Sequence, residues 1–222
     1  MQPSAVHSGR LIVFVGPAGA GKTTLAHRLI SSAPQRRRFS VSHTTRKIRP
    51  SETDGVDYHF IDRPAFEALI RADAFLEWAL VHDNYYGTSR TEVERDLAAG
   101  RDVFFDIDIQ GALNLHRQLG DKTVLVFIVP PSWAVLVARL EGRGSETDAT
   151  LRRRLRTART ELNALRESPL PWLVIINDKL APAQQDLERL LTSAHPGTPD
   201  RADLVAQMCA AAAADPRAEA PT

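Results

Sequence analysis

The fold class that the sequence predicts is α/β: a mostly parallel sheet covered by helices, with an inserted lobe and a helical lid. Short apolar runs, typical of buried strands, alternate with helical patterns along most of the chain. A glycine-rich loop joins the first apolar run to the first helical pattern, as at the start of a strand–helix–strand unit. Residues 39–88 break this alternation with shorter and more polar segments, which indicates the insertion.

The expected strands of the main sheet are continuous apolar runs that stop at turn-forming or acidic residues. They lie at 11–15, 102–108, 123–129 and 172–176. The expected helices carry apolar residues at helical spacing. They run from Gly21 to just before Pro34 and over 64–71, 89–98, 109–118, 132–141, 148–167 and 180–192. Within the insertion, polar β-like pieces lie at 55–60 and 74–80.

These elements predict one core with two additions. We expect a disordered leader at 1–9, a core made of 10–38 and 89–192, and an inserted lobe at 39–88. A helix, a Gly-Arg-Gly hinge and an arginine-rich helix start predict the lid at about 139–156. Residues 193–222 are rich in Pro, Gly, Asp and Ala, so we expect a loosely ordered tail in which the alanine run 210–214 favours a short helix.

Composition excludes several classes of partner. The formal net charge is +1, with 28 Lys and Arg against 27 Asp and Glu, so charge gives no argument for nucleic acid. Cys209 is the single cysteine, so no disulfide can form within the chain. No apolar stretch approaches the roughly 20 residues of a membrane helix. We therefore expect a cytoplasmic protein, with neither nucleic acid nor membrane as partner.

The glycine-rich loop is a phosphate-binding motif. Its pattern G-x-x-x-x-G-K-[ST] is matched by Gly16, Pro17, Ala18, Gly19, Ala20, Gly21, Lys22 and Thr23. Glycines let backbone N–H groups approach phosphate oxygens, and the following helix offers its N-terminus to the anion. Lys22 is expected to reach the β- and γ-phosphates, Thr23 to ligate Mg²⁺ together with water, and Thr24 to complete the nucleotide contacts. The motif accepts ATP or GTP.

A second anion site is predicted by Arg46 and Arg49, which are three residues apart beside several hydroxyl groups. Arginine forks give phosphate dianions bidentate, charge-assisted contacts. Tyr58 and Tyr86 could add hydroxyl groups to the same phosphate. The alternative interpretation, a solvated charged loop, would be preferred for an arginine pair considered alone.

Glu77 indicates which base accompanies that phosphate. It lies in an apolar run, where a buried carboxylate needs partners. Guanine offers two adjacent donors, N1–H and N2–H₂, which suit one carboxylate, whereas adenine offers no such pair. Ser42 and Thr88 supply hydroxyl groups for the O6 and N7 edge. The alternative is that Glu77 is an ordinary surface position of a strand.

Three segments together resemble the guanylate kinase family over residues 10–192: the phosphate loop, the stretch S-x-T-T-R-x-x-R-x-x-E-x-x-G-x-x-Y-x-F and the stretch F-x-E-W…N-Y-Y-G-[ST]. The resemblance implies a P-loop core, a GMP-binding lobe and a mobile lid. It implies Mg²⁺-dependent transfer of a phosphoryl group from ATP to GMP, with dGMP as a further possible acceptor. By similarity, the GMP contacts are Ser42, Arg46, Arg49, Tyr58, Glu77, Tyr86 and Thr88.

The resemblance also implies roles outside these segments. Asp106 and Asp108 end a strand, where carboxylates can hold Mg²⁺ through water, and the family pattern D-x-D-x-Q-G places Asp108 near GMP. Asn177 resembles the asparagine that meets the adenine. Cations delivered by the lid would stabilise the charge of the transferring group. The expected catalytic residues are Lys22, Arg46, Asp108, Arg139, Arg143 and Arg154.

Two other functions are compatible with parts of this pattern. A kinase of another small molecule, such as ribose 1,5-bisphosphate, would keep Lys22 and Thr23 but would not need Glu77 with Ser42 and Thr88. A non-catalytic module that binds phosphopeptides through the same lobe usually has a degraded phosphate loop, whereas the loop of this chain is complete.

Overall fold

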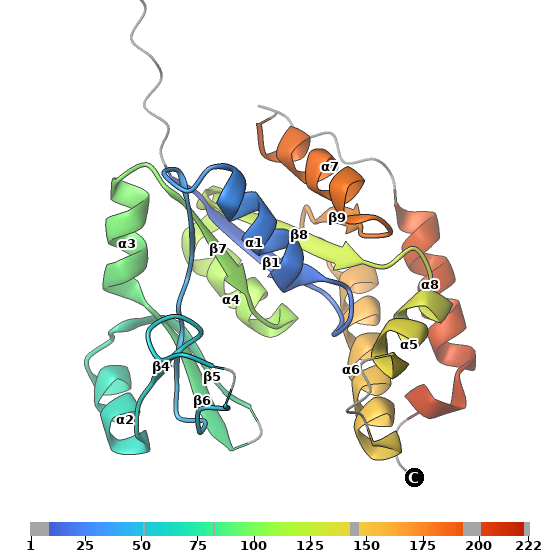
Figure 1. Cartoon of the computed structure of the whole chain (residues 1–222), viewed down its shortest axis with the longest axis horizontal. Helices are drawn as coiled ribbons and strands as arrows, with labels where there is room; N and C mark the ends of the chain where they lie inside the picture. The colour runs from blue at the N-terminus through green and yellow to red at the C-terminus, as the bar shows by residue number, and fades with distance from the viewer. Residues whose placement is uncertain (1–8, 51, 82, 143–146, 193–200, 220–222) are drawn as a thin grey trace, which may run out of the picture. The chain divides into compact units, whose positions relative to one another are not determined.

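The computed structural model describes residues 9–50, 52–81, 83–142, 147–192 and 201–219 (Figure 1). It contains a five-stranded sheet with the order β2-β7-β1-β8-β9 and a four-stranded sheet with the order β4-β3-β6-β5. The chain divides into two compact units. The first unit holds the described residues of 1–12, 32–105 and 110–123, and the second holds those of 13–31, 106–109 and 124–222. The predicted α/β class is confirmed.

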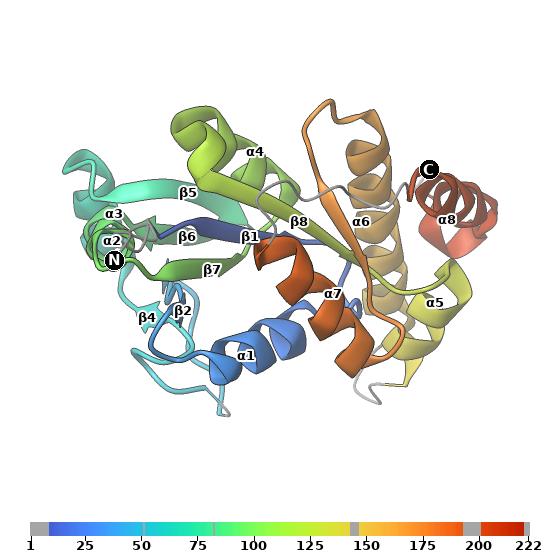
Figure 2. The ribbon, with the colours of Figure 1, turned by 90° about the horizontal axis from the view of Figure 1, so that it is seen from above.

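The second unit is built on fully buried strands. Its elements are the end of β1 (Leu11–Val15), α1 (Lys22–Ser32), β8 (Thr123–Val129), α5 (Trp133–Glu141), α6 (Asp148–Glu167), β9 (Leu173–Ile176), α7 (Leu180–Thr192), α8 (Ala202–Ala214) and the short 3₁₀ helix η2 (Pro216–Ala218). β8 and β9 are parallel, with Val126 opposite Leu173 and Val129 opposite Ile176. Figure 1 labels β8 and β9 next to each other, and Figure 2 shows β8 from above. Side chains on both faces of β1 and β8 are buried, which explains their continuous apolar sequence.

The first unit contains the inserted lobe. Its elements are β2 (Arg37–Phe39), β3 (His43–Thr44), β4 (His59–Phe60), α2 (Arg63–Arg71), β5 (Phe75–Val81), β6 (Asn84–Ser89), α3 (Arg90–Ala98), β7 (Asp102–Asp106), α4 (Ile109–Leu119) and η1 (Gly120–Lys122). The last residue of β7, Asp106, belongs to the second unit. In the lobe, Phe66 stacks on Phe75 and Tyr85 with ring centroids 4.5 and 5.1 Å away. A Cβ atom on Gly87 would lie 2.8 Å from the Phe66 ring, so this cluster requires glycine there.

The elements of the main sheet lie close to the predicted positions, and those of the lobe differ more. β7 ends at Asp106 instead of 108, and the expected strand 55–60 is reduced to β4 at His59–Phe60. The short strands β2, β3 and β6 were not predicted as strands. The expected lobe 39–88 lies wholly within the first unit, which also includes β2, α3, α4 and most of β7.

The expectation of a loosely ordered tail is wrong for residues 201–219. They form α8 and η2, which pack against α6, and α8 also contacts α5. One face of α8 carries apolar residues at helical spacing that are at most 5% exposed: Val205, Met208, Cys209 and Ala212. Burial of this face stabilises the helix, which the overall composition of the tail did not indicate. Residues 193–200 and 220–222 of that expectation, and 1–8 of the leader, lie outside the described residues.

Among the described residues, no helix combines the length and the apolar character needed to span a bilayer.

Candidate active site

The phosphate loop has the backbone that its glycines predict. Gly16 and Gly21 have φ angles of 138° and 86°, which side chains other than that of glycine rarely adopt. A Cβ atom on Gly16 would overlap the carbonyl of Ile128 in β8, and one on Gly21 would overlap the side chain of Asn177. α1 begins at Lys22, so the loop leads directly into the N-terminus of a helix, which favours an anion there.

Lys22, Thr23 and Asp106 form a connected group in the second unit. The Lys22 Nζ atom donates to the carbonyl of Gly16 at 2.6 Å and lies 3.8 Å from Asp106 Oδ1. The Thr23 hydroxyl donates to Asp106 Oδ2 at 2.9 Å. A hydroxyl and a carboxylate side by side are oxygen ligands that suit Mg²⁺, which usually completes its shell with water and substrate phosphates. Asp106 was expected as a possible holder of Mg²⁺ through water, and in the structure this acid lies next to Thr23.

A third acid, Glu161 of α6, lies close enough to Lys22, Asp106 and Asp108 for their charges to act on its pKa. Burial raises the pKa of Glu161 from 4.5 to about 7, the charge of Lys22 acts to lower it, and Asp108 and Asp106 raise it further. Among the described residues, no hydrogen-bond partner contacts the buried Oε2 atom of Glu161. Sequence reasoning missed Glu161. Its signal is the spacing of seven residues from Arg154, which places both residues on one face of α6.

Asn177 lies against the phosphate loop. Its side chain is 6% exposed, and its Nδ2 atom donates to the carbonyl of Ala20 at 2.8 Å. Nearby, Arg139 of α5 donates to the backbone carbonyl of Asp178 at 3.1 Å. The predicted contact of Asn177 with adenine stays a prediction, while its contact with the loop is a feature that the sequence did not reveal.

The remaining lid arginines are placed only in part. Arg154 lies in the second turn of α6, partly buried. Arg143 lies outside the described residues.

Ser42, Glu77 and Thr88 come together in the lobe of the first unit. Glu77 and Thr88 lie directly opposite each other on the antiparallel strands β5 and β6. The Thr88 hydroxyl donates to Glu77 Oε1 at 2.7 Å, and the hydroxyl oxygens of Ser42 and Thr88 are 3.5 Å apart. Thr88 is fully buried. We refer to these three residues as the hydroxyl–carboxylate cluster.

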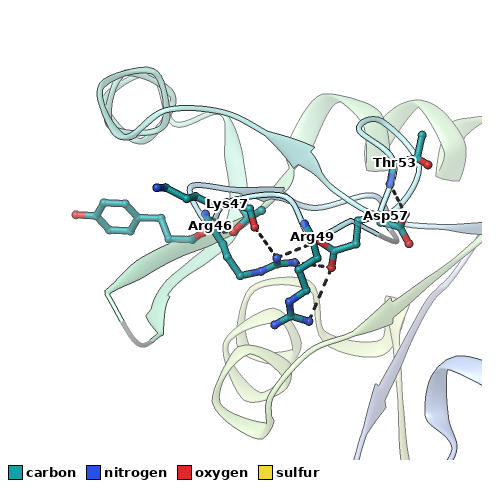
Figure 3. A network of polar contacts seen from close by, with 8 residues as sticks. Arg46, Lys47, Arg49, Thr53 and Asp57 are labelled. Carbon is teal, nitrogen blue, oxygen red and sulfur yellow. Dashed lines mark hydrogen bonds and ion pairs between the residues drawn. The ribbon is translucent and has the colours of Figure 1, made fainter. Parts of the chain in front are cut away.

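Arg46 is held by a carboxylate to which the sequence analysis gave no role. Two nitrogens of its guanidinium donate to the two oxygens of Glu52 at 2.7 and 3.0 Å, and one of them also donates to the carbonyl of Lys47 at 2.7 Å (Figure 3). Glu52 also accepts from the backbone N–H of Arg49 at 2.8 Å. The hydrogen bond to Glu52 raises the pKa of Arg46, and the same bond lowers the pKa of Glu52. Glu52 thus fixes Arg46 and the backbone of Arg49.

Two tyrosines complete this surface. The guanidinium carbon of Arg46 lies 5.4 Å from the centroid of the Tyr58 ring, and the rings of Tyr58 and Tyr86 are 6.0 Å apart. The side chain of Arg49 is 69% exposed. Arg46, Arg49, Tyr58 and Tyr86 therefore share one region of the lobe, as predicted.

The threonines that precede Arg46 have a structural role. Thr44 donates to the carbonyl of Tyr85 at 2.9 Å, and the backbone N–H of Tyr85 donates to the hydroxyl of Thr45 at the same distance. These bonds join β3 to β6. They connect the strand that precedes Arg46 to the strand that carries Tyr86 and Thr88.

Comparison with known proteins places the chain. The sequence model of the family described as guanylate kinase matches residues 8–194, more than four fifths of the chain. The chain belongs to the guanylate kinase family.

Individual guanylate kinases are similar over most of their length. The guanylate kinase of Chlorobium chlorochromatii is 43% identical over 186 residues, which cover 84% of this chain and 96% of that protein. The guanylate kinase of Neisseria meningitidis strain Z2491 is 44% identical over 190 residues, or 86% and 90% of the two chains. The crystal structure of guanylate kinase from Anaplasma phagocytophilum matches with a TM-score of 0.65 at 28% identity, over 83% of this chain and 85% of that one.

The guanylate kinase match ends at residue 194. It includes both groups of predicted site residues but not α8 or η2.

Proposed function

We propose that the chain transfers the γ-phosphoryl group of ATP to GMP and releases ADP and GDP. A complete phosphate loop alone would suit many kinases. The observation that carries the assignment is the hydroxyl–carboxylate cluster, in which Thr88 donates to Glu77 at 2.7 Å beside Ser42. This arrangement fits the N1–H and N2–H₂ donors of guanine, and membership of the guanylate kinase family supports it.

The phosphate loop binds the donor nucleotide. Backbone N–H groups of Gly16–Thr24, with the N-terminus of α1, bind the β- and γ-phosphates. The Lys22 ammonium exchanges its contact with the Gly16 carbonyl, at 2.6 Å, for the phosphate oxygens. Thr23 and Asp106 would hold Mg²⁺ with water and the phosphates, because their oxygens are adjacent. When bound, the metal supplies positive charge that neutralises the phosphate oxygens.

The lobe binds the acceptor. Glu77 accepts from the guanine donors, and Ser42 and Thr88 contact the O6 and N7 edge. Arg46 and Arg49, with the hydroxyl groups of Tyr58 and Tyr86, bind the phosphate of GMP. The bidentate contact with Glu52 holds Arg46 in one orientation, which lowers the conformational entropy lost on binding.

Catalysis consists mainly of positioning and charge neutralisation. The phosphate of GMP is already anionic at neutral pH, so no strong general base is required. Lys22, Arg46, Arg139, Arg143 and Arg154 would stabilise the charge on the transferring group. Asp108 lies in the same unit as the phosphate loop. It would act indirectly, by steadying the groups that surround the acceptor phosphate. The protein would act in the cytoplasm, where both nucleotides are available.

The test is a coupled assay of ADP formation with Mg-ATP and, in turn, GMP, dGMP, AMP, UMP and ribose 1,5-bisphosphate. We expect turnover with GMP to exceed that with AMP and UMP by at least about 100-fold, since a missing donor pair leaves Glu77 unsatisfied. Lys22→Ala should lower kcat/KM by about 1000-fold or more through loss of a charge at the transferring group.

The other outcomes discriminate between the alternatives. Turnover with ribose 1,5-bisphosphate and none with GMP would refute the proposal in favour of a sugar-phosphate kinase. Binding of GMP without ATP binding in calorimetry would favour a non-catalytic module.

A further inference from the structure

The C-terminal segment, residues 201–219, packs against helices that carry two of the predicted lid arginines. α8 and η2 contact α6, which carries Arg154, and α8 contacts α5, which carries Arg139. Figures 1 and 2 show α8 beside both helices. The segment lies beyond residue 194, where the family match ends. It therefore lies outside the region that the family model matches.

A buried acid joins this segment to the start of α5. Asp215, whose side chain is 8% exposed, accepts a hydrogen bond from the indole Nε1 of Trp133 at 3.0 Å. Trp133 is the first residue of α5. The Nε and Nη2 atoms of Arg217 donate to the two oxygens of Asp215 at 3.0 and 2.9 Å. Charge-assisted bidentate pairs of this kind fix orientation as well as distance.

The same arginine reaches the end of α5. Arg217 Nη1 donates to Glu141 Oε1 at 2.9 Å, and Glu141 is the last residue of that helix. Asp215 and Arg217 thus hold α5 at both of its ends. Arg217 holds the pKa of Asp215 down to about 2, with a further contribution from Trp133, so this network stays ionised at neutral pH.

α5 in turn contacts the donor site. A Cβ atom placed on Gly19 of the phosphate loop would lie 3.2 Å from Leu140 Cδ2 and 3.4 Å from Leu136 Cδ1, so both leucines pack against the loop. Arg139, between them, donates to the backbone next to Asn177. A shift of α5 would therefore move the packing of the loop and the position of Arg139 together.

We propose that Asp215 and Arg217 are positioning residues for the donor site, which they influence by holding α5 against the phosphate loop. The kinetic part of this proposal rests on the proposed guanylate kinase function. The C-terminal segment then sets how well ATP is bound and aligned, while the acceptor lobe, in the other unit, is unaffected.

The kinetic test uses Asp215→Asn, which loses the charged pair with Arg217, and Trp133→Phe, which loses only the indole donor. We expect the KM for ATP to rise about fivefold or more and kcat to fall, with the KM for GMP within about twofold of wild type. Arg217→Lys should have a smaller effect than Arg217→Ala, because lysine keeps one charged contact. Leu191→Ala, a core substitution in the last turn of α7, is the control for lower stability alone.

Hydrogen exchange measured by mass spectrometry provides a readout that does not need GMP. In Asp215→Asn we expect faster exchange in 16–24 and 133–141, with exchange in 39–88 unchanged. If these variants lower the melting temperature as Leu191→Ala does, without a selective change in the KM for ATP or in loop exchange, the segment is only structural and the proposal is wrong. If the wild type makes no GDP, the proposed function fails. Hydrogen exchange and the ATP affinity measured by calorimetry then still test whether Asp215 and Arg217 influence the donor site.

Discussion

At the scale of single residues, the proposed choice of acceptor rests on Glu77. Thr88 donates to one of its oxygens at 2.7 Å, which helps to hold the carboxylate in place. In the proposed complex the carboxylate accepts from two guanine donors, so Glu77→Gln would replace one of these favourable contacts by an amide N–H group that faces another donor. We expect the KM for GMP to rise about tenfold or more, as for the loss of a charged hydrogen bond, and the KM for ATP to change less than about twofold.

The measurement is initial-rate kinetics with GMP and AMP as acceptors. Glu67→Gln is the matched control, since this carboxylate lies in the same unit but pairs with Arg63 on the surface. An unchanged ratio of kcat/KM for GMP to that for AMP in Glu77→Gln would contradict base recognition by Glu77.

The contacts of two other acids, Glu52 and Glu161, could not be predicted from the sequence. Glu52 belongs to a recognisable motif, but its bidentate contact with Arg46 depends on how the loop from Lys47 to Thr53 folds back. Glu161 lies in a helix rich in charged residues, where most carboxylates are solvated. Apart from its spacing of seven residues from Arg154, the local sequence does not distinguish it from Glu167, which is 72% exposed. Arg46, Arg49 and Glu77, by contrast, could be named as candidates from the sequence because they lie at fixed spacings in recognisable motifs.

At the scale of elements, the phosphate loop depends on β9. Asn177 follows this strand and donates to the carbonyl of Ala20 at 2.8 Å. In a trans peptide the C=O and the following N–H point in opposite directions. Asn177 therefore fixes the direction of the Gly21 N–H, one of the donors available to phosphate, whichever base the nucleotide carries.

This gives a prediction that differs from a role in adenine recognition. Asn177→Ala should raise the KM for ATP and for GTP by similar factors, about tenfold, because a buried carbonyl loses its donor. Asp178→Ala is the control, since only the backbone of Asp178 contacts Arg139. An increase confined to ATP would show that Asn177 reads the adenine.

Helices and strands could be predicted where the apolar residues follow one long and regular pattern. β1 and β8 are buried on both faces, and the predicted bounds of α6 match the structure, because their apolar patterns are long and regular. β3 and β6 are short and polar, and they pair through side-chain bonds such as that of Thr44 to Tyr85. Such bonds depend on partners about 40 residues away in the chain, so no local pattern reveals them.

At the scale of the whole molecule, the family resemblance correctly indicated the fold of residues 10–192 and missed the C-terminal segment. The buried residues Val205, Met208, Cys209 and Ala212 have helical spacing. They lie in an alanine-rich sequence, however, where the buried and exposed faces differ little in hydrophobicity. What makes it a stable helix is the face that α6 and α5 offer. Contacts between helices so far apart along the chain leave no local sequence pattern, so the sequence alone did not reveal that this face is covered.

The buried acid Glu161 gives the stability of the whole molecule a dependence on pH. Burial raises its pKa to about 7 in the folded state, above the ordinary 4.5; the charge of Lys22 acts to lower the pKa, and Asp108 and Asp106 raise it further. A raised pKa means that the folded state disfavours the ionised form. The associated stability is fully present below about pH 4.5 and is lost as pH rises through about 7.

Glu161→Gln, which stays neutral, should remove this loss. A rise from 4.5 to about 7 corresponds to about 3 kcal/mol at 1.36 kcal/mol per unit. Relative to wild type, the variant should therefore gain up to about 3 kcal/mol in its free energy of unfolding between pH 5 and pH 8. Urea unfolding at both pH values measures this gain, with the exposed Glu167→Gln as control. Parallel changes in wild type and Glu161→Gln would mean that Glu161 is already ionised at neutral pH and that Lys22, not burial, dominates its surroundings.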